Sequence, residues 1–404
     1  MKLKGRHYVS GRTVEITLQG NLIESVEPVE SANGGTDTWL APALFDSQVN
    51  GFGGRDLNAA GTSPDDVAAV MRLLWEAGVA RFCPTVTTHS FKRMAASLHA
   101  IHQACETDPQ VAHASVCTHV EGPYISSEDG PRGAHPRDHA RPPDWDEFLR
   151  LQEAAGGRIG YITLAPELPG AAAFIERLAT DGPGLTHNGR EIVVALGHHA
   201  GSAVQIRAAV DAGARHCTHL GNGAHAQLPR HPNYLWDQLA EDRLSAGIIA
   251  DGHHLPPAVV KTFVRTKGLD RTILVSDAIA AAGLPPGRYE SGKGTPLEIT
   301  ETGRIQVADT PYLAGSGLRL HEGIGNAVRF ADISLAQSLR LATANPARLF
   351  SIQDVYGQLE PGYSADLLLF HWDETEQRVT VQTTLAGGEV VYRSRRDGAA
   401  PHGT

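Results

Sequence analysis

Short apolar runs and helical patterns alternate through the middle of the chain. Eight runs are apolar enough to be strands buried on both faces, and they span residues 39–45, 79–86, 114–120, 159–164, 191–196, 215–218, 245–250 and 271–275. Segments with helical spacing lie between them, and one of them begins at Ser63-Pro64 followed by two acids, a typical helix start. Eight strand–helix units in roughly 300 residues predict an α/β fold, a (β/α)8 TIM barrel.

The two ends of the chain follow a different pattern. Residues 13–18 and 22–26 near the N-terminus alternate like antiparallel strands, as do segments beginning at residues 367, 378 and 389. Neither end has enough strands for a stable sheet of its own, so we expect the ends to pair. The prediction is a small β-sandwich domain made of residues 1–40 and 355–404, beside a barrel of residues 41–354.

The composition excludes several classes of protein. The 35 Lys and Arg residues against 45 Asp and Glu give a net charge of −10, whereas nucleic-acid binding needs a basic face. No apolar stretch reaches the roughly 18 to 20 residues of a membrane span, and we expect no secretory signal because no apolar segment follows the basic N-terminal residues. The four cysteines show no CxxC spacing, which is typical of reduced thiols and predicts a cytoplasmic protein.

Polar side chains follow nearly every predicted strand. In a TIM barrel the carboxyl ends of the strands share one face, and that face carries the active site. The residues at these positions are Asp46, Gln48, Asn50, Glu121, His198, His199, His219, Asn222, Asp251, His253, His254 and Asp277. Any one of them could be an ordinary loop residue or helix cap, but together they would lie on one face of one barrel.

Three of these residues have the chemistry of metal ligands. Glu121, His198 and His219 offer one carboxylate and two imidazoles, the ligand types of a catalytic zinc with a fourth position open. Such an ion lowers the pKa of water to about 7 and polarises a carbonyl. Asp277 follows the last strand and could accept a proton from that water. The set predicts hydrolysis of an amide or an ester.

At these residues the sequence resembles the amidohydrolase superfamily and, within it, the N-acetylglucosamine-6-phosphate deacetylase family. The similarity covers nearly the whole chain, and the order of its motifs is specific. The motifs are PALFDSQVNGFGG at 42–54, CPT at 83–85, HVEGP at 119–123, TLAPE at 163–167, GH at 197–198, THL at 218–220, AGIIADG at 246–252, VSDA at 275–278 and LAGS at 313–316.

The resemblance implies a role for each candidate residue. It implies that Glu121, His198 and His219 bind the metal, and that Asp277 is the general base and then the general acid. His135 is implied as a second catalytic residue, on the acetyl carbonyl. The implied substrate-binding residues are Asn222, the amide of Gly223, Arg230 and His254. In the family this arginine comes from the neighbouring subunit, so the resemblance also implies a homodimer whose small-molecule amino-sugar substrate contacts both chains, without nucleic acid or membrane.

Two departures from the family pattern leave alternatives open. Many superfamily members carry His-x-His after the first strand, where this chain has Gln48-Val49-Asn50. We therefore expect one divalent metal ion per subunit, Zn²⁺ first, with Fe²⁺, Co²⁺ or Mn²⁺ as alternatives. The family's Asn-Ala-Met and Arg-Glu-Pro-Gly are here NGA at 222–224 and RHPN at 230–233, in the loop expected to contact phosphate and sugar.

The leading expectation is thus metal-dependent hydrolysis of the acetamide of N-acetylglucosamine-6-phosphate to glucosamine-6-phosphate and acetate. The altered loop favours an alternative, a deacetylase acting on a different N-acyl amino sugar or on an N-acyl amino acid. A non-catalytic scaffold with the amidohydrolase fold is the third hypothesis, which the intact metal and base residues disfavour.

Overall fold

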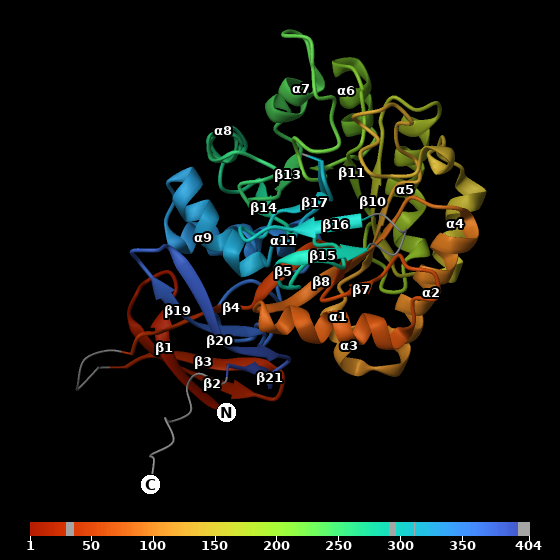
Figure 1. Cartoon of the computed structure of the whole chain (residues 1–404). Helices are drawn as coiled ribbons and strands as arrows, with labels where there is room; N and C mark the ends of the chain where they lie inside the picture. The colour runs from red at the N-terminus through yellow and green to blue at the C-terminus, as the bar shows by residue number, and fades with distance from the viewer. Residues whose placement is uncertain (30–35, 291–295, 311, 395–404) are drawn as a thin grey trace.

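The computed structural model describes residues 1–29, 36–290, 296–310 and 312–394 (Figure 1). Over these residues the chain forms a barrel with helices around it and a sheet at one side, in which the red N-terminal and blue C-terminal strands lie together. Within the same residues, no helix is both long and apolar enough to cross a membrane.

Parallel strands form the barrel, as the alternation of apolar runs predicts. The described residues form eight such strands, bonded in the order β14–β13–β12–β11–β10–β9–β8–β5, and a parallel bridge between Val49 and Ala278 joins the first to the last. The strands are β5 (Leu44–Val49), β8 (Val79–Thr87), β9 (Thr118–Glu121), β10 (Ile159–Leu164), β11 (Val193–Leu196), β12 (His216–Cys217), β13 (Ser245–Ile248) and β14 (Thr272–Leu274). Every residue of β10 is buried, because strands of a barrel are covered on both faces. The (β/α)8 prediction is confirmed.

Helices cover the outer face of the barrel. They are α1 (Pro64–Glu76), α2 (Phe91–Thr107), α3 (Pro109–Ala114), α4 (Trp145–Ala154), α5 (Ala171–Leu185), α6 (Ala203–Asp211), α7 (Tyr234–Ala240), α8 (Pro257–Lys267), α9 (Leu320–Ala331), α10 (Leu335–Leu341) and α11 (Ala344–Leu349). The helix predicted at Ser63 begins there, because Ser63 and Asp66 satisfy each other's backbone amides in a capping box and Pro64 needs no amide partner.

Both chain ends contribute to one antiparallel-rich sheet, the end sheet of the small β-sandwich domain. Its strands are β1 (Lys2–His7), β2 (Thr13–Gln19), β3 (Leu22–Pro28), β4 (Thr38–Pro42), β19 (Leu367–Asp373), β20 (Arg378–Ala386) and β21 (Glu389–Arg393). Strand β4 joins the two halves, since it pairs with β1 on one side and with β19 on the other. Ile16, Ile23 and Leu385 form part of a buried apolar cluster under this sheet. The domain limits at residues 40 and 355 stay a prediction.

The first barrel strand is not where the apolar pattern placed it. The prediction of one strand at residues 39–45 is wrong, because β4 belongs to the end sheet and only β5 belongs to the barrel. Buried residues continue across the break at Ala43, so the hydrophobic pattern does not locate it. Asp46 and Gln48 consequently lie on the first barrel strand instead of after it.

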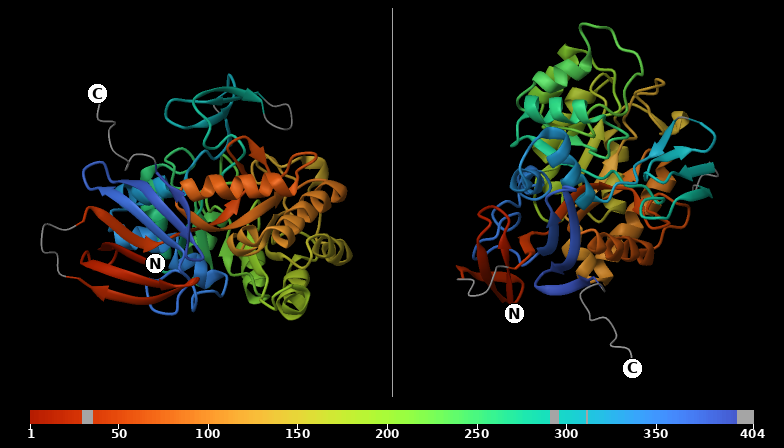
Figure 2. Two further views of the ribbon diagram at one scale, coloured as in Figure 1. Left: turned by 90° about the horizontal axis from the view of Figure 1, so that it is seen from below. Right: turned by 60° about the vertical axis from the view of Figure 1, so that its left-hand side comes forward.

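An inserted sheet between β14 and α9 has no counterpart in the sequence prediction. Its strands are β15 (Gly287–Glu290), β16 (Pro296–Ile299), β17 (Ile305–Val307) and β18 (Leu313–Gly315), and they pair antiparallel in chain order. Figure 2 shows this sheet projecting from the barrel. These strands are only three or four residues long, at or below the shortest alternating run from which a strand is predicted.

Candidate metal centre and active site

The candidate metal ligands come from three barrel strands. Glu121 is the last residue of β9, and His198 and His219 each lie two residues beyond the end of β11 and β12. Asp277 lies three residues beyond β14. His198, His219 and Asp277 all have positive φ, at 53°, 28° and 50°. This conformation costs a non-glycine residue on the order of 1 kcal/mol or more and is concentrated at functional sites.

The structure brings the three ligand residues into contact. Nε2 of His198 and Nε2 of His219 lie 3.1 and 2.9 Å from the same oxygen, Oε1 of Glu121. The two imidazole nitrogens are 3.0 Å from each other, and all three side chains are buried. A single proton cannot satisfy three such atoms at once, whereas one cation can.

The electrostatics of the cluster also favour a cation. Burial alone would raise the pKa of Glu121, but hydrogen bonds and charge from His198 and His219 outweigh it and hold that pKa well below its ordinary value. Burial lowers the pKa of His219, yet the hydrogen bond and charge of Glu121 raise it to about 9. The ionised, buried carboxylate therefore draws positive charge to itself. With one carboxylate and two imidazoles as donors, these residues fit a divalent metal ion.

Two contacts that sequence reasoning missed hold the ligands in place. Nδ1 of His198 lies 2.9 Å from the carbonyl oxygen of Pro131, so Nδ1–H donates and Nε2 keeps its lone pair for the metal. Nε2 of Gln48 donates to Oε1 of Glu121 at 2.9 Å. The sequence offers one signal for this contact, since Gln48 and Asn50 are two residues apart and their side chains would share one face of an extended segment.

The carboxyl group of Asp277 lies close enough to Glu121 for the charge of Glu121 to act on it. Burial, and next the negative charge of Glu121, raise the pKa of Asp277 to about 6. Nδ2 of Asn50 donates to Oδ1 of Asp277 at 2.7 Å, which orients the carboxyl. A carboxyl group whose pKa lies near neutrality can both accept and return a proton.

Among the described residues, Asp46 forms no hydrogen bond with Glu121, His198 or His219. Its Oδ1 accepts from the backbone amide of Ser276 at 3.1 Å and of Gln48 at 3.4 Å, which ties β5 to the chain after β14. Burial raises the pKa of Asp46 to about 7. The structure therefore gives this candidate a role in joining the first and last strands.

His135 joins the cluster from the long segment after β9. Its Nε2 lies 3.9 Å from Oε2 of Glu121, and its ring packs edge-on against His198 with the centroids 4.3 Å apart. The ring is 8 % exposed. His135 thus lies beside the metal ligands, where a carbonyl brought to the cluster would contact it.

The candidate substrate-binding residues lie in two loops. Asn222 is held by its side-chain amide, which donates to the carbonyl of His219 at 3.2 Å. Gly223 has φ of +55°, and a Cβ there would lie 2.6 Å from Nδ1 of His198, so only glycine lets this loop pass against the ring. His254 follows β13 and is close enough to Asp277 for its charge to act on that carboxyl.

The structure does not bring Arg230 into the site of its own chain. Arg230 is exposed, and its guanidinium forms no hydrogen bond or ion pair with any residue in the described ranges. The loop that carries it precedes α7 and projects from the barrel (Figure 1). The loop therefore passes against the ring of His198 at Gly223 and carries Arg230 at an exposed position.

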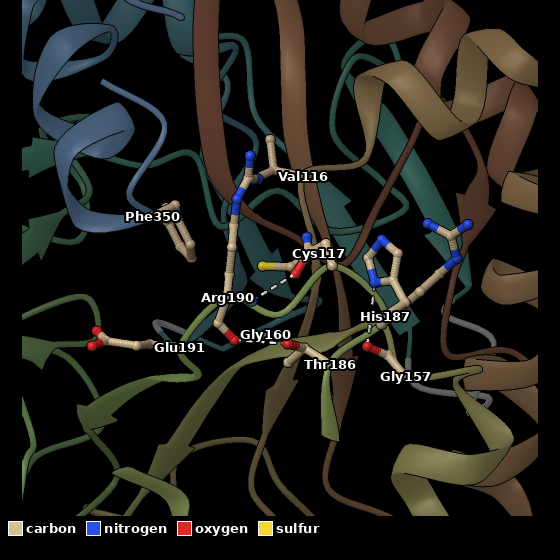
Figure 3. Close-up of a pocket in the computed structure, with 11 residues that line it drawn as sticks. Val116, Cys117, Gly157, Gly160, Thr186, His187, Arg190, Glu191 and Phe350 are labelled. Carbon is tan, nitrogen blue, oxygen red and sulfur yellow. Dashed lines mark hydrogen bonds between the residues drawn. The ribbon is translucent and has the colours of Figure 1, made fainter. Parts of the chain in front are cut away.

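A second pocket lies at the opposite end of the barrel. Cys117 and Glu191 line it, just before β9 and β11, together with His187 and Arg190 (Figure 3). The described residues contain one group of three potential metal ligands, and it is the cluster at Glu121. The chemistry expected from the sequence therefore belongs to the carboxyl ends of the strands.

The comparison with known proteins agrees with this geometry. The model of the amidohydrolase family matches residues 39–391. The human N-acetylglucosamine-6-phosphate deacetylase is 33% identical over 375 residues, which cover 88% of this chain and 84% of that protein. An N-acetylgalactosamine-6-phosphate deacetylase of Escherichia coli O157:H7 is 29% identical over 374 residues, which cover 92% and 94%.

A solved structure has the same overall fold. A mutant of N-acetyl-D-glucosamine-6-phosphate deacetylase from Mycobacterium smegmatis, in complex with N-acetyl-D-glucosamine-6-phosphate, superimposes with a TM-score of 0.80 at 26% identity. The match covers 94% of this chain and 95% of that one. The family match extends over most of the chain and includes every residue of the cluster, so the protein belongs to the amidohydrolase family.

Proposed function

We propose that this protein is a metal-dependent deacetylase that hydrolyses the acetamide of N-acetylglucosamine-6-phosphate to glucosamine-6-phosphate and acetate. The observation that carries the proposal is the buried convergence of Glu121, His198 and His219 beside Asp277. Relatives whose names state this activity match nearly the whole chain. The scaffold hypothesis does not explain why a chain would retain all three candidate ligands and the base, with His198, His219 and Asp277 in strained backbone conformations.

The proposed mechanism divides the work among a few residues. Glu121, His198 and His219 would hold a divalent ion, which would supply Lewis acidity at the amide carbonyl and acidify water. Asp277 accepts the proton of the attacking water at its carboxylate and later donates it to the departing amine. Asn50 holds Asp277 in position through their 2.7 Å hydrogen bond. His135 would donate to the acetyl oxygen.

The distal end of the substrate would be bound by the two loops. We assign Asn222, the amide of Gly223 and His254 to the sugar phosphate. Arg230 would complete this site from the partner subunit of a homodimer, because its guanidinium is unused in its own chain's described contacts and a guanidinium fork suits a phosphate dianion.

The metal is proposed to be one Zn²⁺ per subunit. Glu, His and His are a catalytic zinc set, although Fe²⁺, Co²⁺ and Mn²⁺ accept the same donors. Gln48 and Asn50 occupy the place of a second pair of ligands and donate hydrogen bonds there instead. Cys83, Cys105, Cys117 and Cys217 are all free thiols, and we propose a cytoplasmic location on the earlier compositional argument.

A second candidate substrate is N-acetylgalactosamine-6-phosphate, the C4 epimer. The relative from Escherichia coli named for that substrate matches 92% of the chain, and the loop at residues 222–233 departs from the pattern of the family.

Acetate release from four compounds by the zinc-loaded protein separates these functions. The compounds are N-acetylglucosamine-6-phosphate, its C4 epimer, unphosphorylated N-acetylglucosamine and an N-acetyl amino acid. The proposal expects the highest kcat/KM for the first compound, and a kcat about 10²–10⁴-fold lower with Asp277→Asn. A preference for the epimer or for an unphosphorylated compound would replace the assignment, and no hydrolysis of any compound would favour a scaffold.

The shared site has its own test, by complementation. If each site takes its arginine from the partner subunit, Arg230→Ala and Asp277→Asn each damage both sites of their own homodimer. A co-expressed mixed dimer would then contain one intact site, with Asp277 from one chain and Arg230 from the other. Recovered activity in the mixed dimer supports the swap. A mixture no more active than the better homodimer, or a monomer in sedimentation, contradicts it.

A further inference from the structure

A layer of polar side chains lies inside the barrel, one or two positions before the candidate metal ligands. This polar layer consists of Thr85 on β8, His119 on β9, Thr163 on β10 and Thr218, the residue after β12. None of the four is more than 2 % exposed. The interior of a TIM barrel is ordinarily filled by branched apolar side chains, and a buried polar group costs free energy unless it is hydrogen-bonded. Filling space therefore does not explain the polar layer.

Hydrogen bonds join the polar layer into one chain across neighbouring strands. Nδ1 of His119 lies 3.3 Å from Oγ1 of Thr85, and Nε2 of the same ring lies 2.8 Å from Oγ1 of Thr163. Oγ1 of Thr163 lies 2.6 Å from Oγ1 of Thr218. The ring of Tyr161 stacks on the ring of His119 with the centroids 3.8 Å apart. His119 is thus held at both nitrogens and on one face.

The protons of this chain have one consistent arrangement. The hydroxyl of Thr85 donates to the carbonyl of Cys83 at 3.1 Å, so Nδ1–H of His119 must donate to Thr85. Burial lowers the pKa of His119 to about 3, and a neutral ring with its proton on Nδ1 accepts at Nε2. The hydroxyl of Thr163 therefore donates to the ring and accepts from the hydroxyl of Thr218. Each contact has one donor and one acceptor, and a buried network satisfied in this way is rigid.

One end of the chain lies next to the candidate metal ligands. Thr218 directly precedes His219. Thr163 lies opposite Glu121 in the parallel pairing of β9 and β10, and His119 is two positions before Glu121 on the same strand. A change in the relative register of these strands would therefore change the separation of the carboxylate from the imidazole.

The other end of the chain lies next to the residues that support the ligands. Oγ1 of Thr85 accepts from the backbone amide of Val49 at 3.0 Å. Val49 lies between Gln48 and Asn50, whose side chains donate to Glu121 and to the proposed base. The chain thus ties the first barrel strand to the strands that carry the ligands.

We propose that the polar layer is a positioning network for the metal: its hydrogen bonds fix the relative register of the strand ends and so hold Glu121 and His219 at the spacing that one divalent ion requires. The inference rests on the proposed function, since it takes these residues as the metal ligands. It makes the hydroxyl of Thr163, at the middle of the chain, a determinant of metal affinity although Thr163 does not itself contact the ion.

The competing explanation is that Thr163 only stabilises the barrel. Two substitutions separate these roles, because Thr163→Val keeps the shape of the side chain without its hydroxyl and Thr163→Ser keeps the hydroxyl without the methyl group. Thr384 on β20 offers a matched control. It is fully buried in the end sheet, away from the cluster, and its hydroxyl donates to the carbonyl of Trp75 at 2.7 Å. Thr384→Val removes a buried hydroxyl in the same way.

Zinc affinity, measured by competition with a chromophoric chelator, reports the difference without any turnover. We expect Thr163→Val to raise the Kd for Zn²⁺ on the order of tenfold, the lower end of the loss for residues that orient metal ligands. Thr163→Ser and Thr384→Val should stay within about twofold of wild type, although both valine variants lower the unfolding midpoint. The visible spectrum of the Co²⁺-substituted protein should change in Thr163→Val alone, because it reports the geometry of the ligands.

A double-mutant cycle tests whether the hydroxyls act as one chain. Thr218→Val should weaken zinc binding less than Thr163→Val, because the bond from Thr163 to His119 remains. The double variant should bind zinc as Thr163→Val does, since both changes remove the same contact. If Thr163→Val does not fold, the comparison of Thr218→Val with Thr218→Ser makes the same decision.

The opposite results would overturn the inference. Unchanged zinc affinity in both valine variants, a loss in Thr163→Ser as large as in Thr163→Val, or an additive loss in the double variant would assign the polar layer to barrel stability. Wild-type protein that binds zinc but hydrolyses none of the four compounds refutes the proposed function instead, and the zinc titrations still decide this inference. Wild-type protein that binds no zinc overturns both.

Discussion

Asp366 places a buried negative charge between the barrel and the end sheet, and its removal is predicted to loosen their contact. The residue precedes β19 and is 1 % exposed. Oδ2 accepts from Nε of Arg81 on β8 at 2.8 Å, and Oδ1 from Nε2 of His113 on α3 at 2.7 Å. The amide of Gly387, between β20 and β21, also donates to Oδ1 at 2.6 Å. The carboxylate thus joins barrel and end sheet.

Asparagine at position 366 keeps the shape of the side chain and loses its charge. One of its two polar atoms becomes a donor that faces other donors, so at least one contact becomes repulsive. Breaking a buried ion pair by removing one partner costs about 3–5 kcal/mol. The side chains of Arg81 and His113 are 18% and 26% exposed, so they recover some hydration and the lower figure applies. At about 2.1 cal/mol/K per residue for unfolding entropy, 3 kcal/mol lowers the midpoint of this chain by roughly 4 °C.

The effect has a defined pH dependence. Burial would raise the pKa of Asp366, but the charge of Arg81 and the hydrogen bond from His113 outweigh burial and hold it well below its ordinary value. A depressed pKa in the folded state means that the carboxylate stabilises the fold above the unfolded pKa of about 4. This contribution is lost as the pH falls from about 4 through the folded pKa. The difference between wild type and Asp366→Asn should therefore be constant above about pH 5 and shrink below pH 4.

Thermal unfolding followed by circular dichroism from pH 7.5 down to pH 3.5 measures the difference. Glu15→Gln is the control, because it removes an ion pair with Lys2 on the surface of the same sheet, and exposed pairs contribute little. An unchanged midpoint at pH 7.5, or a difference that does not shrink below pH 4, would refute the reasoning.

Three further predictions concern single side chains. Asp277→Asn should lower kcat about 10²–10⁴-fold, the contribution of general acid–base catalysis, with metal content by elemental analysis unchanged; lost metal would make Asp277 a ligand first. Asn50→Ala should lower kcat roughly tenfold at unchanged KM, because the base loses a charged hydrogen bond, and a change confined to KM would contradict this. Lys267→Met should lower the unfolding midpoint by several degrees and leave kcat at 25 °C intact. The reason is that the buried ammonium donates to three backbone carbonyls, which would lose their partner. An unchanged midpoint would show that the carbonyls find other donors.

Much of the architecture could be predicted from local patterns. Strand β10 has the predicted limits, 159–164, because apolar residues are continuous there and turns bound them on both sides. The helix start at Ser63 could be predicted for a similar reason, since a capping box is complete within four residues. The break at Ala43 could not be predicted, because the strands that pair with β4 and β5 lie elsewhere in the chain. The inserted sheet of β15 to β18 could not be predicted, because its strands are too short to show a clear alternation.

The candidate metal ligands could also be proposed from the sequence, and the contacts that support them could not. Glu121, His198 and His219 each follow a predicted parallel strand, and the carboxyl ends of such strands meet at one face. The hydrogen bond of Gln48 to Glu121 depends on the relative register of two strands. Asp251 shows the same limit at short range, since its carboxylate contacts the ring of His254, three residues away, only because the turn between them has the right shape.

The residue types and, for Glu121, His198 and His219, the strand that each follows could be predicted from the chain alone, because apolar runs and side-chain alternation are local properties. Which atoms meet depends on how the barrel closes. Asn50 and Asp277 are separated by 227 positions and Gln48 and Glu121 by 73, and they touch because the barrel closes with β5 beside β14 and brings β9 within reach of β5. Arg230 shows the same division, since its residue type and spacing are visible in the chain, whereas its exposure is known only from the fold.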